Sequence, residues 1–263
     1  MDLLSIASGS SGNCYYVGSE ETHLLVDAGV SGKKIESALN EIDRKPSDLN
    51  GILVTHEHID HVKGLGVMAR KHGIPIYTTG GTISEIKKMS SVGTIDDSLF
   101  HEIEPDEPFF INDLSIDASA IWHDAADPVC YSISDGKSKF SIATDMGNYD
   151  EYVVNKLKNS DIMVIEANHD IRMLQAGPYP YYLKQRILGN RGHLSNERSG
   201  ALLNSHIKAI LLGHLSKENN FEELAYETVK LELSDNEYAS DVREFGLEVA
   251  RRDRPGALLT VGN

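Results

Sequence analysis

One motif constrains the fold more than any other part of the chain: the pattern HxHxDH at residues 56–61, which follows a short apolar run typical of a buried strand. Side chains two residues apart in an extended segment face the same way, so His56 and His58 can hold one ion. Asp60 and His61 lie beyond the strand end, where the chain can turn and offer them to a second ion. Imidazole and carboxylate ligands together favour Zn, Mn or Fe over Ca or Mg.

Three further metal-binding side chains, His123, Asp145 and His214, each follow an apolar run that predicts a strand. Ligands at the ends of separate strands converge more plausibly on one site than on three. Taken singly, each could still be an ordinary polar loop residue. The other histidines without ligand context are expected in the core or on the surface: His23, His72, His101 and His206.

The hydrophobic pattern predicts an α/β (α+β) chain with two sheets and helices outside both, because mixed strands come first and strand–helix alternation follows. Strands are expected at 3–7, 14–18, 22–27, 75–78, 114–122, 129–134, 139–144, 162–166 and 209–212. Helices are expected at 32–42, 62–72, from about 82, and at 149–158, 181–188, 196–205 and 221–233. Asp135-Gly136 favours a tight turn. Without repeats or linkers, residues 1–263 are predicted to form a single domain.

The composition of the chain bears on where in the cell the protein is expected. Hydrophobic residues make up 40% of the chain, enough for a sizeable core, and no apolar run is long enough to span a bilayer. The N-terminus lacks the basic start of a signal peptide. Cys14 and Cys130 fall in predicted strands without ligand spacing, so two buried thiols are expected. We therefore predict a cytoplasmic protein with no membrane association and no obligatory protein partner.

The net charge of −15 argues against nucleic-acid binding, since DNA-binding proteins usually have a basic face. Basic residues nevertheless gather between Lys184 and Arg198. Tyr179, Tyr181 and Tyr182 precede them, and they could stack on bases or pack in the core. The loop from Ser8 to Asn13 lacks the context of a nucleotide P-loop. Its backbone could form a phosphate nest near Ser10, Ser11 and Asn13, or a plain hairpin.

The HxHxDH motif resembles the metallo-β-lactamase superfamily. Three other segments resemble the bacterial YycJ (WalJ) family, in its nuclease-like branch: residues 7–16 (ASGSSGNCYY), 123–128 (HDAADP) and 213–220 (GHLSKENN). The resemblance implies a four-layer αββα sandwich. One departure is Cys130, where that family usually has glycine, but it lies past the proposed ligand.

The same resemblance implies two divalent metal ions and a role for each ligand. The first ion would be held by His56, His58 and His123, and the second by Asp60, His61 and His214, with Asp145 bridging both. Asp27 occupies the early aspartate position of the superfamily and would hold ligands without touching metal, although it could equally be a turn residue.

A proton donor is implied by a likeness to tRNase Z enzymes. Glu166-Ala167 and the run Gly192-His193-Leu194-Ser195 resemble their Glu-Ala and Gly-His-Ser segments. There a Glu–His pair protonates the leaving group, so His193 would be the general acid and Glu166 its orienting partner. His193 could instead cap the helix that follows, and His169 could take the acid role. Asp60 counts among both the catalytic residues and the ligands.

Together these features favour a binuclear metal-dependent phosphodiesterase that uses a metal-bridged hydroxide. Two divalent ions and two carboxylates leave a centre of about +2, which suits an anionic phosphodiester. The family resemblance implies a 5′-to-3′ exonuclease acting on double-stranded DNA. An alternative, which the acidic charge favours, is a hydrolase of small esters, thioesters or cyclic phosphodiesters. A second alternative is a non-catalytic regulatory module that metals stabilise.

Overall fold

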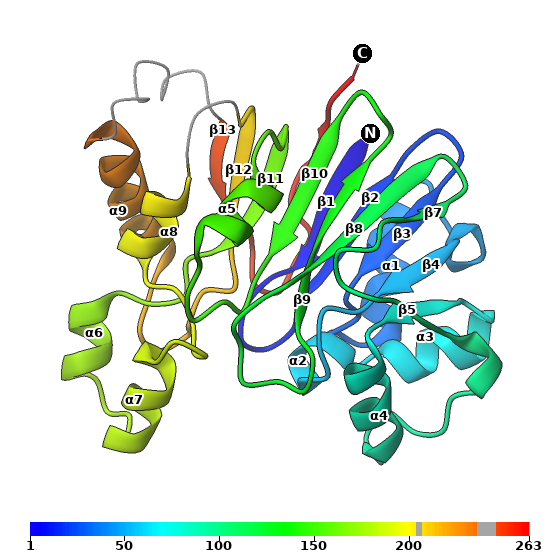
Figure 1. Ribbon diagram of the computed structural model, residues 1–263, viewed down its shortest axis with the longest axis horizontal. Helices are drawn as coiled ribbons and strands as arrows, with labels where there is room; N and C mark the ends of the chain where they lie inside the picture. The colour runs from blue at the N-terminus through cyan, green and yellow to red at the C-terminus, as the bar shows by residue number, and fades with distance from the viewer. Residues whose placement is uncertain (204–206, 236–245, 263) are drawn as a thin grey trace. The chain divides into compact units, whose positions relative to one another are not determined.

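The computed structural model describes residues 1–203, 207–235 and 246–262, and these form two compact units (Figure 1). Unit 1 comprises Met1–Ala120, Ala125–Ser138 and Arg251–Asn263. Unit 2 comprises Ile121–Asp124 and Lys139–Ala250. Each unit is therefore assembled from more than one segment of the chain, and a single domain over 1–263 stays a prediction.

Unit 1 contains a mixed sheet in the order β14-β1-β2-β3-β4-β5-β6. From β14 to β3 neighbouring strands are antiparallel, and from β3 to β6 they are parallel. The strands are β1 (Asp2–Ala7), β2 (Cys14–Gly18), β3 (His23–Val26), β4 (Gly51–Leu53), β5 (Ile76–Thr78), β6 (Phe100–Glu102) and β14 (Leu258–Thr260). The parallel half brings the carboxyl ends of β3 and β4 to one edge, from which the HxHxDH loop leaves.

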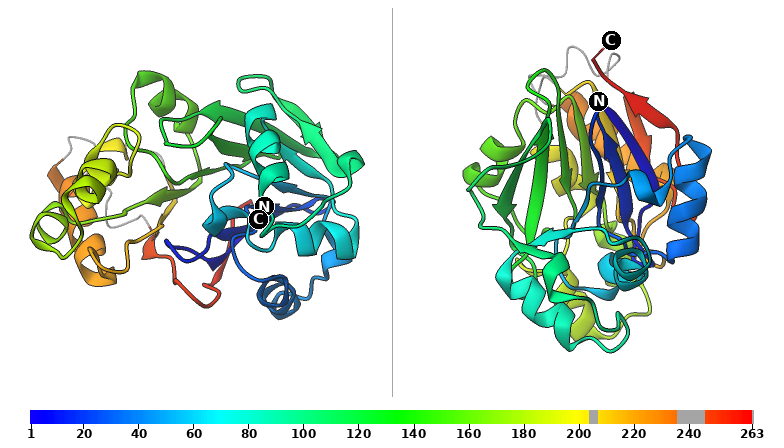
Figure 2. Two further views of the ribbon diagram at one scale, coloured as in Figure 1. Left: turned by 90° about the horizontal axis from the view of Figure 1, so that it is seen from below. Right: turned by 90° about the vertical axis from the view of Figure 1, so that its right-hand side faces the viewer.

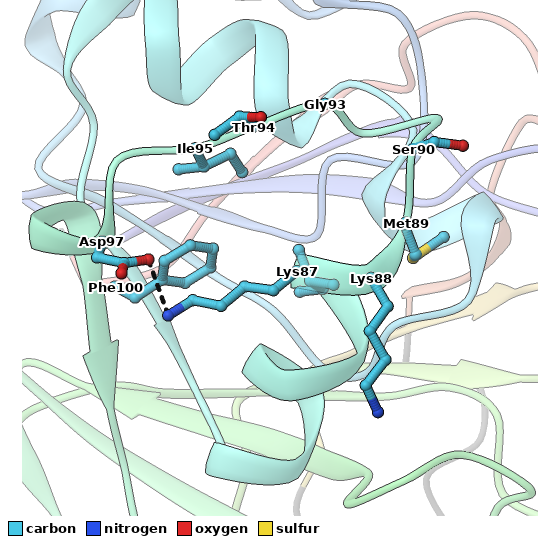
Figure 3. A pocket seen from close by; sticks show the side chains of 10 residues that line it. Lys87, Lys88, Met89, Ser90, Gly93, Thr94, Ile95, Asp97 and Phe100 are labelled. Carbon is cyan, nitrogen blue, oxygen red and sulfur yellow. Dashed lines mark ion pairs between the residues drawn. The ribbon is translucent and has the colours of Figure 1, made fainter.

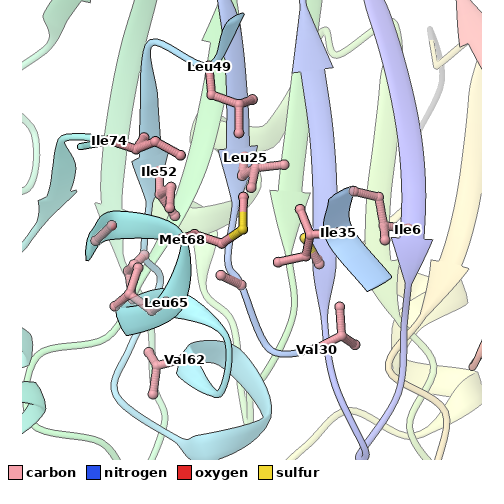
Figure 4. Packing of buried hydrophobic residues seen from close by; sticks show 14 of the residues in the cluster. Ile6, Leu25, Val30, Ile35, Leu49, Ile52, Val62, Leu65, Met68 and Ile74 are labelled. Carbon is pink, nitrogen blue, oxygen red and sulfur yellow. The ribbon is translucent and has the colours of Figure 1, made fainter. Parts of the chain in front are cut away.

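The helices of unit 1 are α1 (Gly32–Glu41), α2 (Ile59–Val62), α3 (Leu65–His72) and α4 (Gly80–Lys88), with short 3₁₀ turns at Pro46–Asp48 and Asp97–Leu99. Two of them, α1 and α3, pack against the sheet, and two further views show these helices (Figure 2). Ile35 of α1 and Met68 of α3 pack in one cluster with Leu25 and Ile52 of the strands (Figure 4). Burial of this apolar face fixes α1 and α3 on the sheet that carries the candidate site.

A second group of strands in unit 1 is antiparallel: β7 (Phe109–Ile111), β8 (Leu114–Ala120) and β9 (Val129–Ser134). The buried Tyr131 hydroxyl of β9 donates to the Val54 carbonyl at 3.0 Å, just after β4. The predicted turn is present after β9, where the Asp135 carboxylate accepts the backbone N–H groups of Lys137 and Ser138. β9 is thereby tied to the strand that leads into the HxHxDH loop.

Unit 2 is built on four parallel strands in the order β10 (Lys139–Ala143), β11 (Ile162–Glu166), β12 (Ala209–Gly213) and β13 (Gly246–Val249). Its helices are α5 (Glu151–Leu157), α6 (Ile171–Ala176), α7 (Tyr181–Leu188), α8 (Asn196–Leu202) and α9 (Glu222–Asp235). Gly200 allows α8 close to α9, since a Cβ there would lie 2.5 Å from the Glu232 Cβ. The parallel strands end at one common edge.

Most predicted elements are confirmed to within a few residues, and 14–18, 129–134, 162–166 and 181–188 match the observed bounds. The single helix predicted at 62–72 is wrong, because the chain breaks at Gly64 into α2 and α3. Gly64 N donates to the Ala28 carbonyl, and a Cβ there would lie 2.1 Å from the Val30 carbonyl oxygen. β6, β7, α6, β13 and β14 had not been expected. The end of the helix predicted at 196–205 and His206 lie outside the described residues.

The two cysteines are buried and form no disulfide, as expected. Burial is the main cause that raises the pKa of the Cys14 thiol well above its ordinary value. Across the described parts of the chain, no helix combines the length and the apolar character that crossing a bilayer requires.

Candidate active site

In unit 1, the loop after β4 places three predicted ligand histidines close together. The His56 ring centroid lies 4.6 Å from that of His58 and 4.1 Å from that of His61. His58 is the residue before α2, and the single turn of α2 carries Asp60 and His61. An Asp60 carboxylate oxygen lies 3.7 Å from His61 Nε2. The motif therefore forms a compact group of imidazoles with one adjoining carboxylate.

Asp27, directly after β3, holds this loop through a buried network. Its carboxylate accepts the Thr55 backbone N–H at 2.8 Å and the Thr55 hydroxyl at 2.9 Å. It also accepts His61 Nδ1–H at 2.7 Å. Because the single Thr55 hydroxyl hydrogen goes to Asp27, the Thr55 oxygen accepts from His56 Nδ1, 3.0 Å away. Both imidazoles are thereby fixed in the tautomer whose Nε2 has a lone pair for a metal.

Asn13, predicted to bind phosphate, instead turns its side chain inward. Its amide oxygen accepts from Gly9 N at 2.9 Å, and its amide nitrogen lies 3.1 Å from His61 Nε2. Its backbone N–H donates to the Asp60 carbonyl at 2.7 Å. Ser10 and Ser11 are exposed, and Ser10 Oγ accepts from the Arg252 guanidinium at 3.4 Å. Within this loop, Asn13 is thus buried and bonded to α2, whereas Ser10 and Ser11 are exposed and Ser10 lies beside Arg252.

In unit 2, buried acids and histidines gather where neighbouring parallel strands end. Asp145 follows β10, Glu166 ends β11 and His214 follows β12. Asp145 Oδ1 lies 3.1 Å from His214 Nδ1, 3.5 Å from His193 Nδ1 and 3.7 Å from His123 Nε2. These residues, separated by up to 91 positions in the sequence, form one cluster at one sheet edge.

Glu166 and His193 form the pair expected of an acid and its orienting carboxylate. Glu166 Oε2 accepts from His193 Nδ1 at 3.1 Å, while Oε1 accepts the backbone N–H of Leu194 at 3.1 Å. Full burial raises the pKa of Glu166, but the charge and hydrogen bond of His193, with a bond from His214, outweigh it and leave the pKa below 4.5. Glu166 is therefore held as a carboxylate, which accepts from His193 Nδ1 and orients that ring.

His169, the other candidate for the acid, has a different environment. It is 1% exposed, and its Nδ1 lies 3.4 Å from the Asn168 side-chain oxygen. Burial lowers the pKa of His169 to about 4, against a smaller opposing effect of Glu166. An imidazole with a pKa of about 4 is neutral near pH 7, so it lacks the second proton that an imidazolium donates as a general acid. The surroundings therefore favour His193 for the role.

The backbone just before His193 orients the His123 ring. Its Nδ1 donates to the Gly192 carbonyl at 3.0 Å, which leaves Nε2 as the metal-binding nitrogen. The neighbouring Asp124 carboxylate accepts from the Arg186 guanidinium, with one bond of 3.0 Å. The sequence offered no signal for Gly192 or for this ion pair, because the partners are far apart along the chain. Thr55 was likewise missed, although it adjoins the motif.

Three of the predicted site residues adopt a left-handed backbone: Asp27 (φ 60°), Asp145 (φ 61°) and His214 (φ 51°). Each directly follows, or lies two residues after, a strand end. Residues other than glycine rarely adopt this conformation, and they cluster at functional sites when they do. The chain thus turns sharply where each strand ends, and this turn places Asp27, Asp145 or His214 at the edge of its sheet.

The donor chemistry of unit 2 fits divalent metal ions. Two sets of ligand atoms lie within 4.8 Å of one another: His123, Asp145 and His193 form one, and Glu166, His193 and His214 the other. Buried nitrogen and carboxylate donors at this spacing suit zinc-type ions. In unit 1, the Nε2 atoms of His56 and His61 are oriented for the same purpose. The residues present therefore fit divalent ions.

A separate cavity in unit 1, of about 620 Å³, contains none of the predicted site residues (Figure 3). Lys87 crosses it, pairs with Asp97 at 2.8 Å and lies over the Phe100 ring at 5.3 Å. Its basic side chain is thus already neutralised. The cavity is lined by Ile86, Lys87, Lys88, Met89, Ser90, Gly93, Thr94, Ile95, Asp97 and Phe100.

Comparison with known proteins gives the family. The model of the β-lactamase superfamily domain matches residues 22–214. The protein named Exodeoxyribonuclease WalJ of Streptococcus pneumoniae strain D39 is 43% identical over 233 residues, which cover 87% of each chain. Exodeoxyribonuclease YycJ of Bacillus anthracis is 37% identical over 88% of each chain.

The solved structures give the fold. The metallo-β-lactamase fold protein YhfI from Bacillus subtilis superposes with a TM-score of 0.69 over 97% of this chain and 98% of its own, at 17% identity. This likeness confirms the predicted fold class, a sandwich of mixed sheets flanked by helices. The matched segment, residues 22–214, contains the HxHxDH loop and every other candidate ligand. The chain therefore belongs to the metallo-β-lactamase superfamily and, within it, to the family that includes WalJ and YycJ.

Proposed function

We propose that the protein is a metal-dependent phosphodiesterase that degrades DNA as an exonuclease. The observation that carries this proposal is the Glu166–His193 pair at 3.1 Å, a proton donor beside the buried Asp145 and His214. A site that only stabilises a fold has no need of such a donor. The names of the relatives, both exodeoxyribonucleases, support DNA as the substrate. Action on duplex DNA from 5′ to 3′ is the finer part of the proposal.

We assign the seven ligands as the family resemblance implies. The first ion would be held by His56, His58 and His123, the second by Asp60, His61 and His214, and Asp145 would be shared. Zn, Mn and Fe all suit these donors. When bound, such ions would supply positive charge that polarises a phosphodiester and lowers the pKa of water. The assignment rests on the motif and on the donor arrangement within each unit.

The chain's own residues would do the remaining work. His193, oriented by Glu166, would give a proton to the departing alkoxide oxygen. Asp27 and Thr55 keep His61 and His56 in the tautomer that binds metal. The exposed Ser10, beside the Arg252 guanidinium, and the exposed Ser11 would contact phosphate. The predicted cytoplasmic location remains a prediction.

A second candidate is a hydrolase of small esters, thioesters or cyclic phosphodiesters. The net charge of −15 favours it, because an acidic surface repels a polyanion. The regulatory-module alternative has less support, because Glu166 and His193 would then have no task.

The decisive experiment is a degradation assay with end-labelled single- and double-stranded DNA and RNA under Zn or Mn, with a cyclic phosphodiester alongside. The proposal expects mononucleotides to be released from duplex DNA labelled at its 5′ end. Hydrolysis of the cyclic diester without loss of any polymer would instead establish the small-substrate function. No turnover of any substrate by metal-loaded protein would contradict both.

A further inference from the structure

Helix α7 in unit 2 carries two adjacent tyrosines that the protein leaves in solvent. Tyr181 is 78% exposed and Tyr182 is 75% exposed, whereas Ile187 of the same helix is buried. The sequence left open whether these rings pack in the core or face outward. Their exposure shows that packing within unit 2 does not explain them.

The segment around α7 is basic in an acidic chain. Between 171 and 196 the sequence has Arg172, Lys184, Arg186 and Arg191 but no aspartate or glutamate, whereas the whole chain has a net charge of −15. Arg172 and Arg191 are exposed. Arg186 pairs with Asp124, and Lys184 donates to a backbone carbonyl at 2.7 Å. Two of the four cations, Arg172 and Arg191, are thus exposed to solvent in the same segment as the exposed rings.

α7 is joined to the candidate active site by hydrogen bonds within unit 2. His193 N donates to the Ile187 carbonyl of α7 at 3.0 Å. His123 Nδ1 donates to the Gly192 carbonyl at 3.0 Å, and Arg186 of α7 holds Asp124, the residue after His123. A ligand bound along α7 would therefore lie next to the chain segment that presents the candidate acid.

We propose that α7 is the surface that holds the nucleic acid substrate beside the cleavage site, an inference that rests on the proposed nuclease function. Tyr181 and Tyr182 stack on bases near the end being degraded, and Arg172 and Arg191 contact phosphates. Every base offers a π face, so stacking suits an exonuclease that must accept any sequence. The positive charge of this segment would help a chain of net negative charge to bind a polyanion.

The test compares the Tyr181→Ala/Tyr182→Ala variant with the wild type on duplex DNA labelled at its 5′ end. Loss of stacking should raise KM about tenfold or more, with a smaller change in kcat. The Tyr181→Phe/Tyr182→Phe variant, which keeps both rings, should retain the wild-type KM. The matched control is Phe110→Ala, a residue of unit 1 that is 72% exposed. An unchanged KM in the alanine variant, or an equal loss in the phenylalanine variant, would overturn the proposal.

The arginines give an independent measurement. Arg172→Gln and Arg191→Gln should each reduce the slope of log Kd against log salt for duplex DNA by about 0.9, the value for one phosphate contact on a duplex. Unchanged slopes in both variants would show that Arg172 and Arg191 do not contact phosphates.

Two outcomes separate this proposal from others. If wild-type protein neither binds nor degrades nucleic acid, the proposed function itself fails. If it degrades DNA and the tyrosine variants match it, only the assignment of α7 fails. Co-sedimentation with phosphatidylserine vesicles that requires Tyr181 and Tyr182, with KM for DNA unchanged, would show that the helix binds membranes.

Discussion

Two carboxylates that are not proposed as metal ligands, Asp27 and Glu166, each accept the Nδ1–H of a histidine. Asp27 holds His61 at 2.7 Å, and Glu166 holds His193 at 3.1 Å. The same contact would serve two purposes, since it directs Nε2 of His61 toward a metal in one case and orients the candidate acid His193 in the other. What separates the roles is the exposure of the ring: His61 is fully buried, while the His193 side chain is 14% exposed.

Replacing His193 by alanine should lower turnover on a phosphodiester by about 10²–10⁴-fold, the usual contribution of a positioned acid. Metal content, measured by mass spectrometry after dialysis, should stay at the wild-type value. Asp145→Asn is the contrasting variant and should lose both metal and turnover. Loss of metal from His193→Ala would show that His193 is a ligand and that the assignment is wrong.

Asp27→Asn should weaken metal binding about 10- to 100-fold, because an amide no longer enforces the metal-binding tautomer of His61. Competition with a chromogenic chelator measures this. The control is Asp43→Asn, because Asp43 has a similar backbone (φ 54°) and is exposed. Equal affinity in Asp27→Asn and the wild type would exclude an orienting role.

His169 should make stability depend on pH. Its pKa is lowered to about 4 in the folded chain, so its contribution is complete above the unfolded value of about 6.5 and is lost as pH falls toward 4. The loss should approach about 3 kcal/mol, measured by urea unfolding at several pH values. His169→Gln should flatten the slope over this window, whereas His101→Gln, at an exposed position, should not. The same slope in His169→Gln as in the wild type would contradict the assignment.

Among the elements, the single turn of α2 depends most on its neighbours. Gly29 N donates to the Asn13 carbonyl, and Asn13 N donates to the Asp60 carbonyl. A Cβ at Gly29 would lie 1.7 Å from that Asp60 oxygen. A helix of four residues has little stability of its own, so these contacts set the position of Asp60 and His61.

Gly29→Ala should therefore displace α2, lowering both the unfolding free energy by about 1–3 kcal/mol or more and the affinity for metal. Chemical denaturation and chelator competition measure the two effects. Gly256→Ala is the matched control, since the atom nearest its Cβ would be 3.9 Å away. A Gly29→Ala protein that binds metal as tightly as the wild type would show that α2 tolerates the shift.

The sequence was sufficient for features that a local pattern encodes. Alternation and apolar runs predicted the strands that precede His56, Asp145 and His214, while metal binding by these residues stays a prediction. It was insufficient where distant segments decide the outcome. The inward turn of Asn13 and the break at Gly64 both depend on backbone groups from other parts of unit 1. The exposure of the Tyr181 side chain likewise depends on how α7 packs in unit 2, which the residues next to it in the sequence do not reveal.

At the scale of the whole molecule, metal should stabilise the fold, because the proposed ligands come from many segments between β3 and α9. A metal at 100 times its Kd adds about 2.7 kcal/mol. Treatment with EDTA should therefore lower Tm by about 5–10 °C in differential scanning calorimetry. The effect should be much smaller in Asp145→Asn. An identical Tm with and without EDTA in the wild type would contradict the proposed ligand set.

The left-handed backbone at Asp27, Asp145 and His214 limits how these positions can evolve. Aspartate, asparagine, histidine and glycine are the residues most at ease in that conformation, and others cost on the order of 1 kcal/mol or more. Glutamate at 145 would keep the charge and strain the backbone, whereas asparagine would keep the backbone and lose the charge. A substitution at any of these three sites must therefore suit both the left-handed backbone and the chemistry of the side chain, and few residues do.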